Sequence, residues 1–168
     1  MAKYLYAVLR RAIACKIMKK IRNKEFIDDV SDWTVYKEEN KQNEIYFLMI
    51  GIDHFKAVID EFDYDVADKV LIELAKVIHS NINEFDMVGR LNGDEFLVSI
   101  LNNTSEHQAE ELAKKIISDF AEISILVDEE KKQSLKKTIC VGFEIYRLNS
   151  DITITDCIKN ADIALYEA

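Results

Sequence analysis

Residues 87–100 read MVGRLNGDEFLVSI, and this stretch decides the fold. Short apolar runs flank Asn92-Gly93, and Asn-Gly is the strongest two-residue signal for a tight hairpin because both turn positions tolerate a positive φ. The stretch therefore predicts a β-hairpin. Two carboxylates, Asp94 and Glu95, follow the turn, and Mg²⁺ in proteins is commonly held by one or two carboxylates together with phosphate oxygens. The alternative is that these acids only solvate an exposed turn.

The segments on either side of the hairpin alternate between strand and helix patterns. Residues 45–50 form a six-residue apolar run, which is long enough for a buried central strand. Apolar residues at three- and four-residue spacing then predict helices over 66–78 and 109–120, with Asp65 as a plausible cap of the first. Residues 138–146 are rich in β-forming side chains, and a last helix begins at Thr155.

This order of elements predicts an α/β (α+β) fold. A β-α-β-β-α-β core is typical of ferredoxin-like domains, and we expect a sheet with its helices on one face. In such a fold the end of the first strand lies beside the tip of the central hairpin. Asp53, which follows the first strand, is therefore expected to meet Asp94 and Glu95. With three acids at one edge, a metal or phosphate site becomes as good an interpretation as a solvated turn.

The composition indicates one globular domain in a reducing, cytoplasmic setting. The chain has 168 residues, of which 49% are hydrophobic and 32% charged, and its three cysteines show no paired spacing. Residues 1–24 carry eight Lys or Arg and no acid, so the remainder holds 14 of the 22 basic residues against all 31 acidic ones, a net charge of −17. Nucleic acid is not expected as a partner, because binding phosphates requires clustered positive charge.

The chain divides into residues 1–41, a basic helix and linker, and residues 42–168, the domain itself. Apolar residues recur at helical spacing over 3–22, but basic residues interrupt every apolar run, so the segment is too charged to span a bilayer. A basic amphipathic helix can lie on an anionic membrane, and residues 1–24 fit that description. A helix that packs against a neighbouring segment or a partner chain is the favoured interpretation.

Five motifs, in this order and at the right separations, resemble the GGDEF domain over roughly residues 44–168. They are Ile52-Asp53-His54-Phe55-Lys56, Asp65-x-x-Asp68-x-x-Leu71, Arg90-x-Asn92-Gly93-Asp94-Glu95-Phe96, residues 138–142, and Ala161-Asp162-x-Ala164-Leu165-Tyr166. Domains of this family are diguanylate cyclases, which join two GTP molecules into cyclic di-GMP, or inactive relatives that bind nucleotides or partners. The resemblance implies a cyclase-type palm fold. In active members it also implies Mg²⁺ or Mn²⁺, GTP, and two domains that face each other.

The resemblance assigns expected roles to residues at matching positions. The metal-binding, catalytic carboxylates of the namesake motif are Asp94 and Glu95, and Asp53 matches the second acid of the family's Asp-x-Asp, which makes it a candidate metal ligand. The remaining matches form a nucleotide-binding set, in which Phe55 and Lys56 wrap the triphosphate, Lys159 reaches the phosphates and Asp68 reads guanine. Two turn residues complete this set, Asn92 and Gly93.

Departures from the family pattern indicate a degenerate variant. The family's first metal-binding Asp is replaced by Gly51, which has no side chain with which to coordinate. The guanine-reading Asn is replaced by Ile59, which has no hydrogen-bonding side chain, and an unmade buried hydrogen bond costs about 1–3 kcal/mol. The first glycine of the namesake motif is Asn92, which adds a side chain where substrate approaches closely.

These retained and replaced family residues lead to three hypotheses about function. The favoured hypothesis is a GGDEF domain without cyclase activity that serves as a regulatory or dimerising module, with a second copy or another signalling domain as its partner. Retained Asp94 and Glu95 support a second hypothesis, a working diguanylate cyclase with relaxed requirements. The third is a sensor that binds GTP or a related nucleotide through Lys56 and Lys159 and turns nothing over.

Overall fold

The computed structural model describes residues 44–83, 86–100, 104–128, 132–147 and 150–168. The predicted helix over 3–22 and its linker lie outside these residues, and the domain boundary after residue 41 stays a prediction. The described elements, in chain order, are β1 (Glu44–Ile52), α3 (Phe55–Glu61), α4 (Tyr64–Asn81), β2 (Met87–Asn92), β3 (Glu95–Ile100), α5 (Glu106–Glu122), β4 (Ile125–Asp128), β5 (Gln133–Leu135), β6 (Ile139–Arg147) and α6 (Ile154–Glu167).

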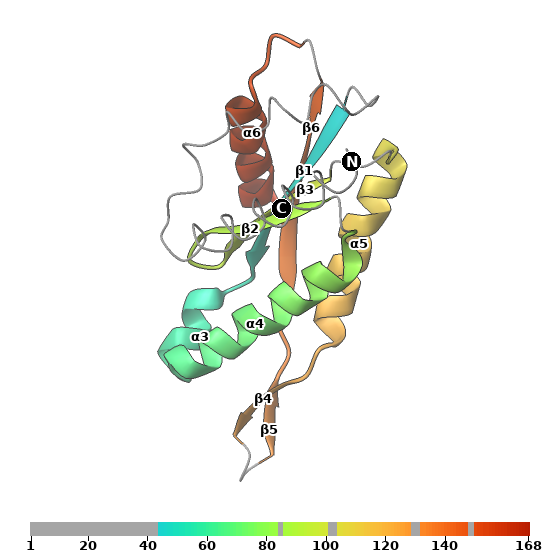
Figure 1. The fold of residues 1–168 in the computed structure, drawn as a ribbon. Coiled ribbons are helices and arrows are strands. Elements are labelled where there is room, and N and C mark those ends of the chain that lie inside the picture. Colours follow the sequence, from blue (N-terminus) through green and yellow to red (C-terminus); the bar gives the residue numbers. More distant parts are fainter. Residues whose placement is uncertain (1–43, 84–85, 101–103, 129–131, 148–149) are drawn as a thin grey trace, which may run out of the picture.

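A four-stranded antiparallel sheet organises these elements (Figure 1). Its strand order is β2-β3-β1-β6, so β1 pairs with β3 on one side and with β6 on the other. The run predicted as a central strand is buried throughout, from Ile45 to Ile50. The predicted α/β fold class is confirmed.

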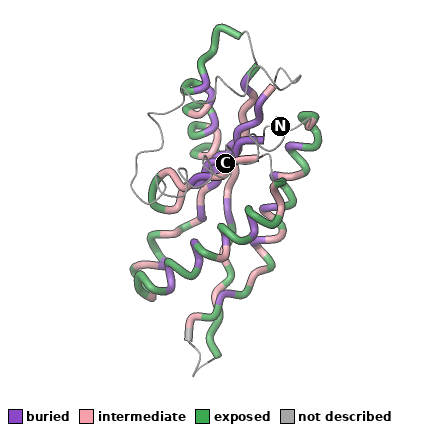
Figure 2. Tube along the Cα trace, viewed as in Figure 1, coloured by how far each residue is buried: buried purple, intermediate pink, exposed green. Residues whose placement is uncertain are grey.

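Helices cover both faces of this sheet, whereas the sequence led us to expect them on one. Alternate residues of β1, such as Leu48 and Ile50, belong to a hydrophobic cluster with α4 and α5. The intervening residues, such as Phe47 and Met49, belong to a second cluster with α6. A strand that is apolar at every position must be covered on both sides. Helix α6 therefore lies opposite α4 and α5, and buried residues run through the middle of the molecule (Figures 1 and 2).

Helix α6 packs unusually close to β6. A Cβ atom built on Gly142 of β6 would lie 1.9 Å from the carbonyl oxygen of Ala161 and 2.5 Å from the backbone nitrogen of Leu165, both in α6. Backbone atoms cannot yield as a flexible side chain can, so only glycine fits there. A glycine inside a strand often marks such a close approach.

The central hairpin forms as predicted, but its turn lies one residue later. Asn92 pairs with Glu95, so the two turn residues are Gly93 and Asp94. Of these, only Gly93 has a positive φ, of 48°. A register shift between Arg90 and Asn92 moves the turn along the chain. The Arg90 Nε atom donates a hydrogen bond to the Gly93 carbonyl at 2.6 Å and closes the tip.

Side-chain caps begin three of the helices. Asp63, rather than the expected Asp65, caps α4 and accepts a hydrogen bond from the Val66 backbone at 2.9 Å. Helices α5 and α6 begin with capping boxes, which satisfy backbone donors reciprocally. The β4–β5 hairpin was not predicted, because its strands are too short to show a period. None of the described helices combines the length and apolar character needed to cross a bilayer.

Candidate functional site

The candidate site lies where β1 ends beside the hairpin. Strands β1 and β3 pair Met49 with Leu97 and Ile50 with Phe96. Gly51 directly follows the last paired residue of β1, and Glu95 directly precedes its partner Phe96 in β3. The end of β1 next to the retained acid therefore has a residue without a side chain.

Leu165 of α6 lies over Gly51. A Cβ atom built at Gly51 would lie 3.2 Å from Cδ2 of Leu165, which is tight but involves the end of a flexible side chain. An alanine at position 51 would therefore need Leu165 to move by a few tenths of an ångström.

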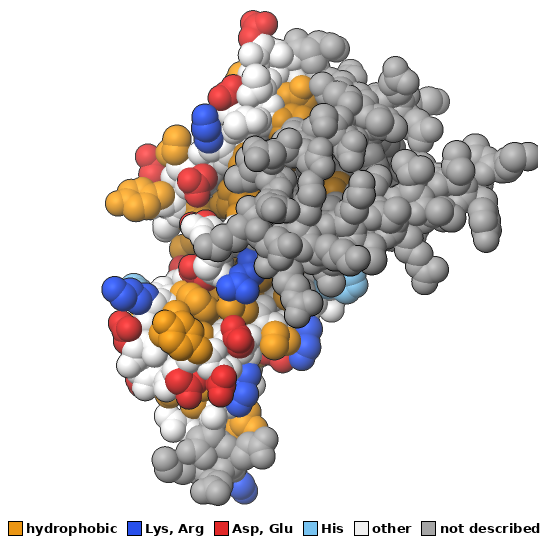
Figure 3. Space-filling view, turned by 60° about the vertical axis from the view of Figure 1, so that its left-hand side comes forward, with side chains coloured by type: hydrophobic (Ala, Val, Ile, Leu, Met, Phe, Trp, Pro, Cys, Tyr) orange, Lys and Arg blue, Asp and Glu red, His pale blue; other side chains and the backbone are white. Residues whose placement is uncertain are grey.

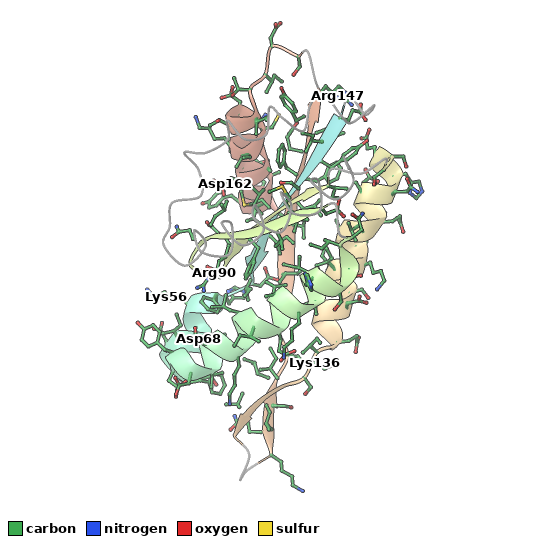
Figure 4. The ribbon with its side chains drawn as sticks, viewed as in Figure 1. Lys56, Asp68, Arg90, Lys136, Arg147 and Asp162 are labelled. Atoms are coloured by element: carbon green, nitrogen blue, oxygen red, sulfur yellow. The ribbon has the colours of Figure 1, made fainter. Side chains whose placement is uncertain are left out.

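Glu95 lies in surroundings that disfavour its charge. Burial is the main cause of a raised pKa for Glu95, and the neighbouring carboxylates of Asp162 and Asp94 raise it further. Asp162 projects from α6, the helix that also covers Gly51 (Figure 4). The carboxylates of Glu95, Asp94 and Asp162 therefore lie close enough to influence one another.

Asp53 makes its hydrogen bonds on the side of β1 that faces β6, away from the hairpin. Its backbone N–H donates to the Thr138 carbonyl at 3.0 Å, and the Thr138 hydroxyl donates to its carboxylate. A hydrogen bond with Asp53 is also the main cause of the raised pKa of the Cys140 thiol. Thr138 and Cys140 lie before and within β6, which flanks β1 on the side away from β3.

The expected meeting of Asp53 with Asp94 and Glu95 is therefore not seen as a ligand cluster. Within the described ranges, no three or more His, Cys, Asp or Glu side chains are grouped so that they could hold a metal ion. At the end of β1, the position that holds the family's first metal-binding Asp contributes no side-chain donor, because it is Gly51. The metal roles of the three acids stay predictions.

The segment expected to bind the nucleotide begins with a left-handed residue, His54, whose φ is 53°. Phe55 and Ile59 are both partly buried. They pack against the hydrophobic cluster that contains buried residues of α4 and α5. The position expected to read guanine is thus turned into the core. Lys56 is exposed, and so is Asp68 on α4 (Figure 4).

The remaining candidates lie at the edges of the site. Asn92 and Gly93 are exposed at the hairpin tip, and Lys159 is exposed on α6. Their roles in nucleotide binding stay predictions.

Three contributors to this site were given no role from the sequence. Thr138 holds Asp53, Asp162 raises the pKa of Glu95, and Leu165 covers Gly51. Thr138, Asp162 and Leu165 all fall inside matched motifs, which was the available signal. Their contacts join segments that are far apart in the sequence, so no local pattern could reveal them.

The family comparison places these features in context. Residues 17–168 match the family described as "Diguanylate cyclase, GGDEF domain". The chain is 35% identical over 136 residues to Diguanylate cyclase A of Treponema denticola, an alignment that covers 81% of this chain and 35% of that protein. It is also 35% identical over 121 residues to a diguanylate cyclase of Vibrio cholerae, covering 72% of this chain and 36% of that protein.

Solved structures show the same fold. The active GGEEF domain of a diguanylate cyclase from Vibrio cholerae superposes with a TM-score of 0.68 at 30% identity, covering 82% of this chain and 83% of that one. The GGDEF domain of DgcB from Caulobacter crescentus, solved with c-di-GMP, superposes with a TM-score of 0.74 at 20% identity, covering 86% and 82%. The chain spans about a third of the length of the two curated cyclases, which align over 35% and 36% of their residues. By sequence and by fold, the chain belongs to the GGDEF family.

Proposed function

We propose that this GGDEF domain does not synthesise cyclic di-GMP and serves as a regulatory or dimerising module of cyclic di-GMP signalling. The observation that carries the proposal is that Gly51, covered by Leu165 of α6, stands at the end of β1 where the family has a metal-binding Asp. Enzymatic phosphoryl transfer depends almost entirely on positioning and on neutralising charge. A site without the carboxylate that the family carries at position 51 has lost one of the groups for that task.

The neighbouring acid does not replace the missing one. Asp53 is bound to Thr138 through both its backbone and its carboxylate. Turning the Asp53 carboxylate toward the hairpin would break its hydrogen bond from the Thr138 hydroxyl, an exposed bond that contributes about 1 kcal/mol.

Recognition of the base is weakened independently. Ile59 is partly buried against the core and has no polar atom in its side chain to offer a guanine. Asp68 remains exposed on α4 as a single candidate contact. A site that discriminates by hydrogen bonding loses selectivity when one of its partners is apolar.

A working cyclase is the second candidate. It is favoured by the retained Asp94 and Glu95, and by the 35% identity to two proteins named diguanylate cyclase. A nucleotide sensor without turnover is the third, and it is favoured by the exposed Lys56 and Lys159.

One pair of measurements separates the three candidates. The whole chain is incubated with GTP and either Mg²⁺ or Mn²⁺, cyclic di-GMP is quantified by chromatography, and GTP binding is measured by calorimetry. We expect product no higher than in the Glu95→Gln variant, which sets the background, and no specific GTP binding. Product above that background overturns the proposal in favour of the cyclase. Binding without product selects the sensor.

The dimerising role has its own readout. Light scattering over a range of protein concentrations is expected to show a reversible dimer. A chain that stays monomeric at every concentration would contradict the dimerising role. Regulation through a different partner protein would then be the remaining form of the proposal.

A further inference from the structure

Helix α6 has an outward face that carries large apolar side chains. Ile163 and Tyr166 follow Lys159 at intervals of four and three residues, which places the three side chains along one side of the helix. The exposed fractions of Ile163 and Tyr166 are 57% and 93%. The buried residues of α6 occupy the other side, where the helix packs closely on β6. We call Lys159, Ile163, Tyr166 and Glu167, which are all exposed, the outer face of α6.

This part of the surface is visible in the space-filling view. Figure 3, in which the left-hand side of Figure 1 comes forward, shows hydrophobic side chains beside basic and acidic ones at the upper left, at the height of α6. Apolar and charged groups are thus presented together on the side of the helix away from the sheet.

The charges of the outer face are arranged symmetrically about Ile163. Lys159 lies four residues before Ile163, and Glu167 lies four residues after it. Lys159 and Glu167 are therefore about 12 Å apart along the helix axis, too far to pair with each other. Within the described ranges neither of them is in an ion pair. A face with a base on one side of an apolar centre and an acid on the other is complementary to itself after a half-turn.

We propose that two copies of this chain associate through the outer face of α6, with the two helices antiparallel about a two-fold axis at Ile163. Such an isologous contact uses the same patch on both copies. It places Ile163 against its own symmetry mate and each Lys159 opposite Glu167 of the second copy. Tyr166 then flanks the aliphatic stem of that lysine. The inference rests on the proposed dimerising role and deepens it by naming the surface.

The other acids of α6 lie away from this contact. Asp156 belongs to the capping box, where the Thr153 hydroxyl donates a hydrogen bond to its carboxylate at 2.6 Å, two turns before Ile163. Asp162 contributes to the raised pKa of Glu95, so it lies toward the hairpin. The acid that the half-turn brings closest to the partner helix is therefore Glu167, which meets a lysine.

The size of the contact predicts a reversible dimer. Helix α6 has 14 residues and is about 21 Å long. Stable interfaces bury about 1,200–2,000 Å² in total, and contacts below that size belong to transient complexes. A contact centred on four residues of each copy falls in the second group. It involves no nucleotide, which separates it from the facing arrangement of two GTP-loaded domains that the family resemblance implies.

Replacing the central residue tests the surface. Ile163→Asp sets two carboxylates against each other at the two-fold axis, so we expect the dimer dissociation constant of the full chain to rise by at least about tenfold, measured by sedimentation equilibrium. Ile72→Asp is the matched control on α4, because its native side chain is 52% exposed and the charge change is the same. The control is expected to change the constant by less than about twofold.

Exchanging the charges tests the antiparallel register. Lys159→Glu and Glu167→Lys each place like charges opposite each other, so each should weaken the dimer by about fivefold. The double variant restores opposite charges across the axis and should return the constant to within about twofold of the wild type. If overall charge alone governed association, the two single changes would act in opposite directions.

A cross-link provides a measurement that does not depend on affinity. Under mild oxidation, Ile163→Cys is expected to form a disulfide between the two copies at position 163, identified by peptide mass spectrometry. Ile72→Cys, treated in the same way, should give at least about fivefold less covalent dimer through position 72.

The outcomes separate this inference from the proposed function. A dimer that Ile163→Asp leaves unchanged, with no disulfide at position 163, would overturn the α6 contact while the dimerising role stands through another surface. A double variant as weak as the single ones would overturn the antiparallel register. A chain that is monomeric at every concentration would overturn the contact and the dimerising role together.

Discussion

The hairpin and the end of β1 are neighbours in the sheet, yet they differ in which acidic side chains they keep and in what those side chains contact. The hairpin keeps Asp94 and Glu95 beside a turn that Gly93 makes with its positive φ. The end of β1 has Gly51 beneath Leu165, and its acid, Asp53, is bound to Thr138. The hairpin keeps two adjacent acids, whereas Gly51 at the end of β1 packs against Leu165.

Under the proposed function, the namesake motif is kept while the cyclase chemistry is lost. The hairpin keeps two half-buried acids, and burial disfavours the charge of Glu95. The end of β1 lies under α6, where a small residue packs well and an unpaired buried carboxylate would be costly. The two halves of the site therefore differ in whether a carboxylate is kept despite its partial burial.

The largest effect is expected where α6 meets β6, the strand that pairs with β1. Gly142→Ala places a Cβ atom 1.9 Å from the Ala161 carbonyl oxygen, so α6 must move. We expect a loss of about 3 kcal/mol in the free energy of unfolding, measured by urea denaturation. Gly51→Ala is the matched control, because its Cβ meets only the flexible end of Leu165, and its loss should stay below about 1 kcal/mol. Equal losses would show that α6 does not fix the β1 half.

A smaller effect is expected from releasing Asp53. Thr138→Val removes the hydroxyl that donates to the Asp53 carboxylate. Because Thr138 is exposed, we expect a loss of about 1 kcal/mol in unfolding free energy, measured by the same method. Thr155→Val, at an exposed position of α6, is the control and should change stability by less than about 0.5 kcal/mol. No difference between the two variants would show that Asp53 is not held by Thr138.

The hairpin half can be tested through pH. The pKa of Glu95 is raised mainly by burial, and also by Asp162 and Asp94. Because the folded pKa lies above the unfolded one, the stability that Glu95 contributes is fully present below the unfolded pKa and is lost as pH rises through the folded pKa. We expect Glu95→Gln, which stays neutral, to be more stable than the wild type near pH 7 and similar to it near pH 4.

Thermal unfolding at a series of pH values measures this difference. Glu110→Gln, on the exposed surface of α5, is the control and should show no such trend. A Glu95→Gln variant that is less stable than the wild type near pH 7 would show instead that the carboxylate is stabilised by a donor or a cation. The carboxylates of Glu95 and Asp53 would then both be stabilised by a partner group.

The smallest effect is expected from restoring one side chain. Gly51→Asp returns a carboxylate to the end of β1, beneath Leu165, but Ile59 still offers nothing to a guanine. We therefore expect cyclic di-GMP synthesis from GTP and Mg²⁺ to stay at background. Clear activity from this single change would contradict the argument that the site has two independent defects. The double variant Gly51→Asp/Ile59→Asn then measures whether the defects are cumulative.

Much of the architecture could be predicted because its signals are local. The apolar run of β1, the helical spacing of α4 and α5, and the hairpin all follow from residues within a few positions of one another. The turn lies one residue later than predicted. The cause is a register shift near Leu91, which depends on how β2 pairs with β3. The position of α6 on the second face was missed because a strand that is apolar throughout does not say what covers each side.

The sequence by itself determined the family, the order of the elements, and the absence of a side chain at Gly51, since these are written in residue identities and their spacing. Only the tertiary structure decided that Asp53 is held by Thr138 and that Glu95 lies among Asp94 and Asp162. These contacts join β1 to the start of β6, and β3 to α6, across 85 and 67 residues of chain. Such long-range contacts depend on the packing of the sheet and its helices, and so they decide what each retained acid is able to do.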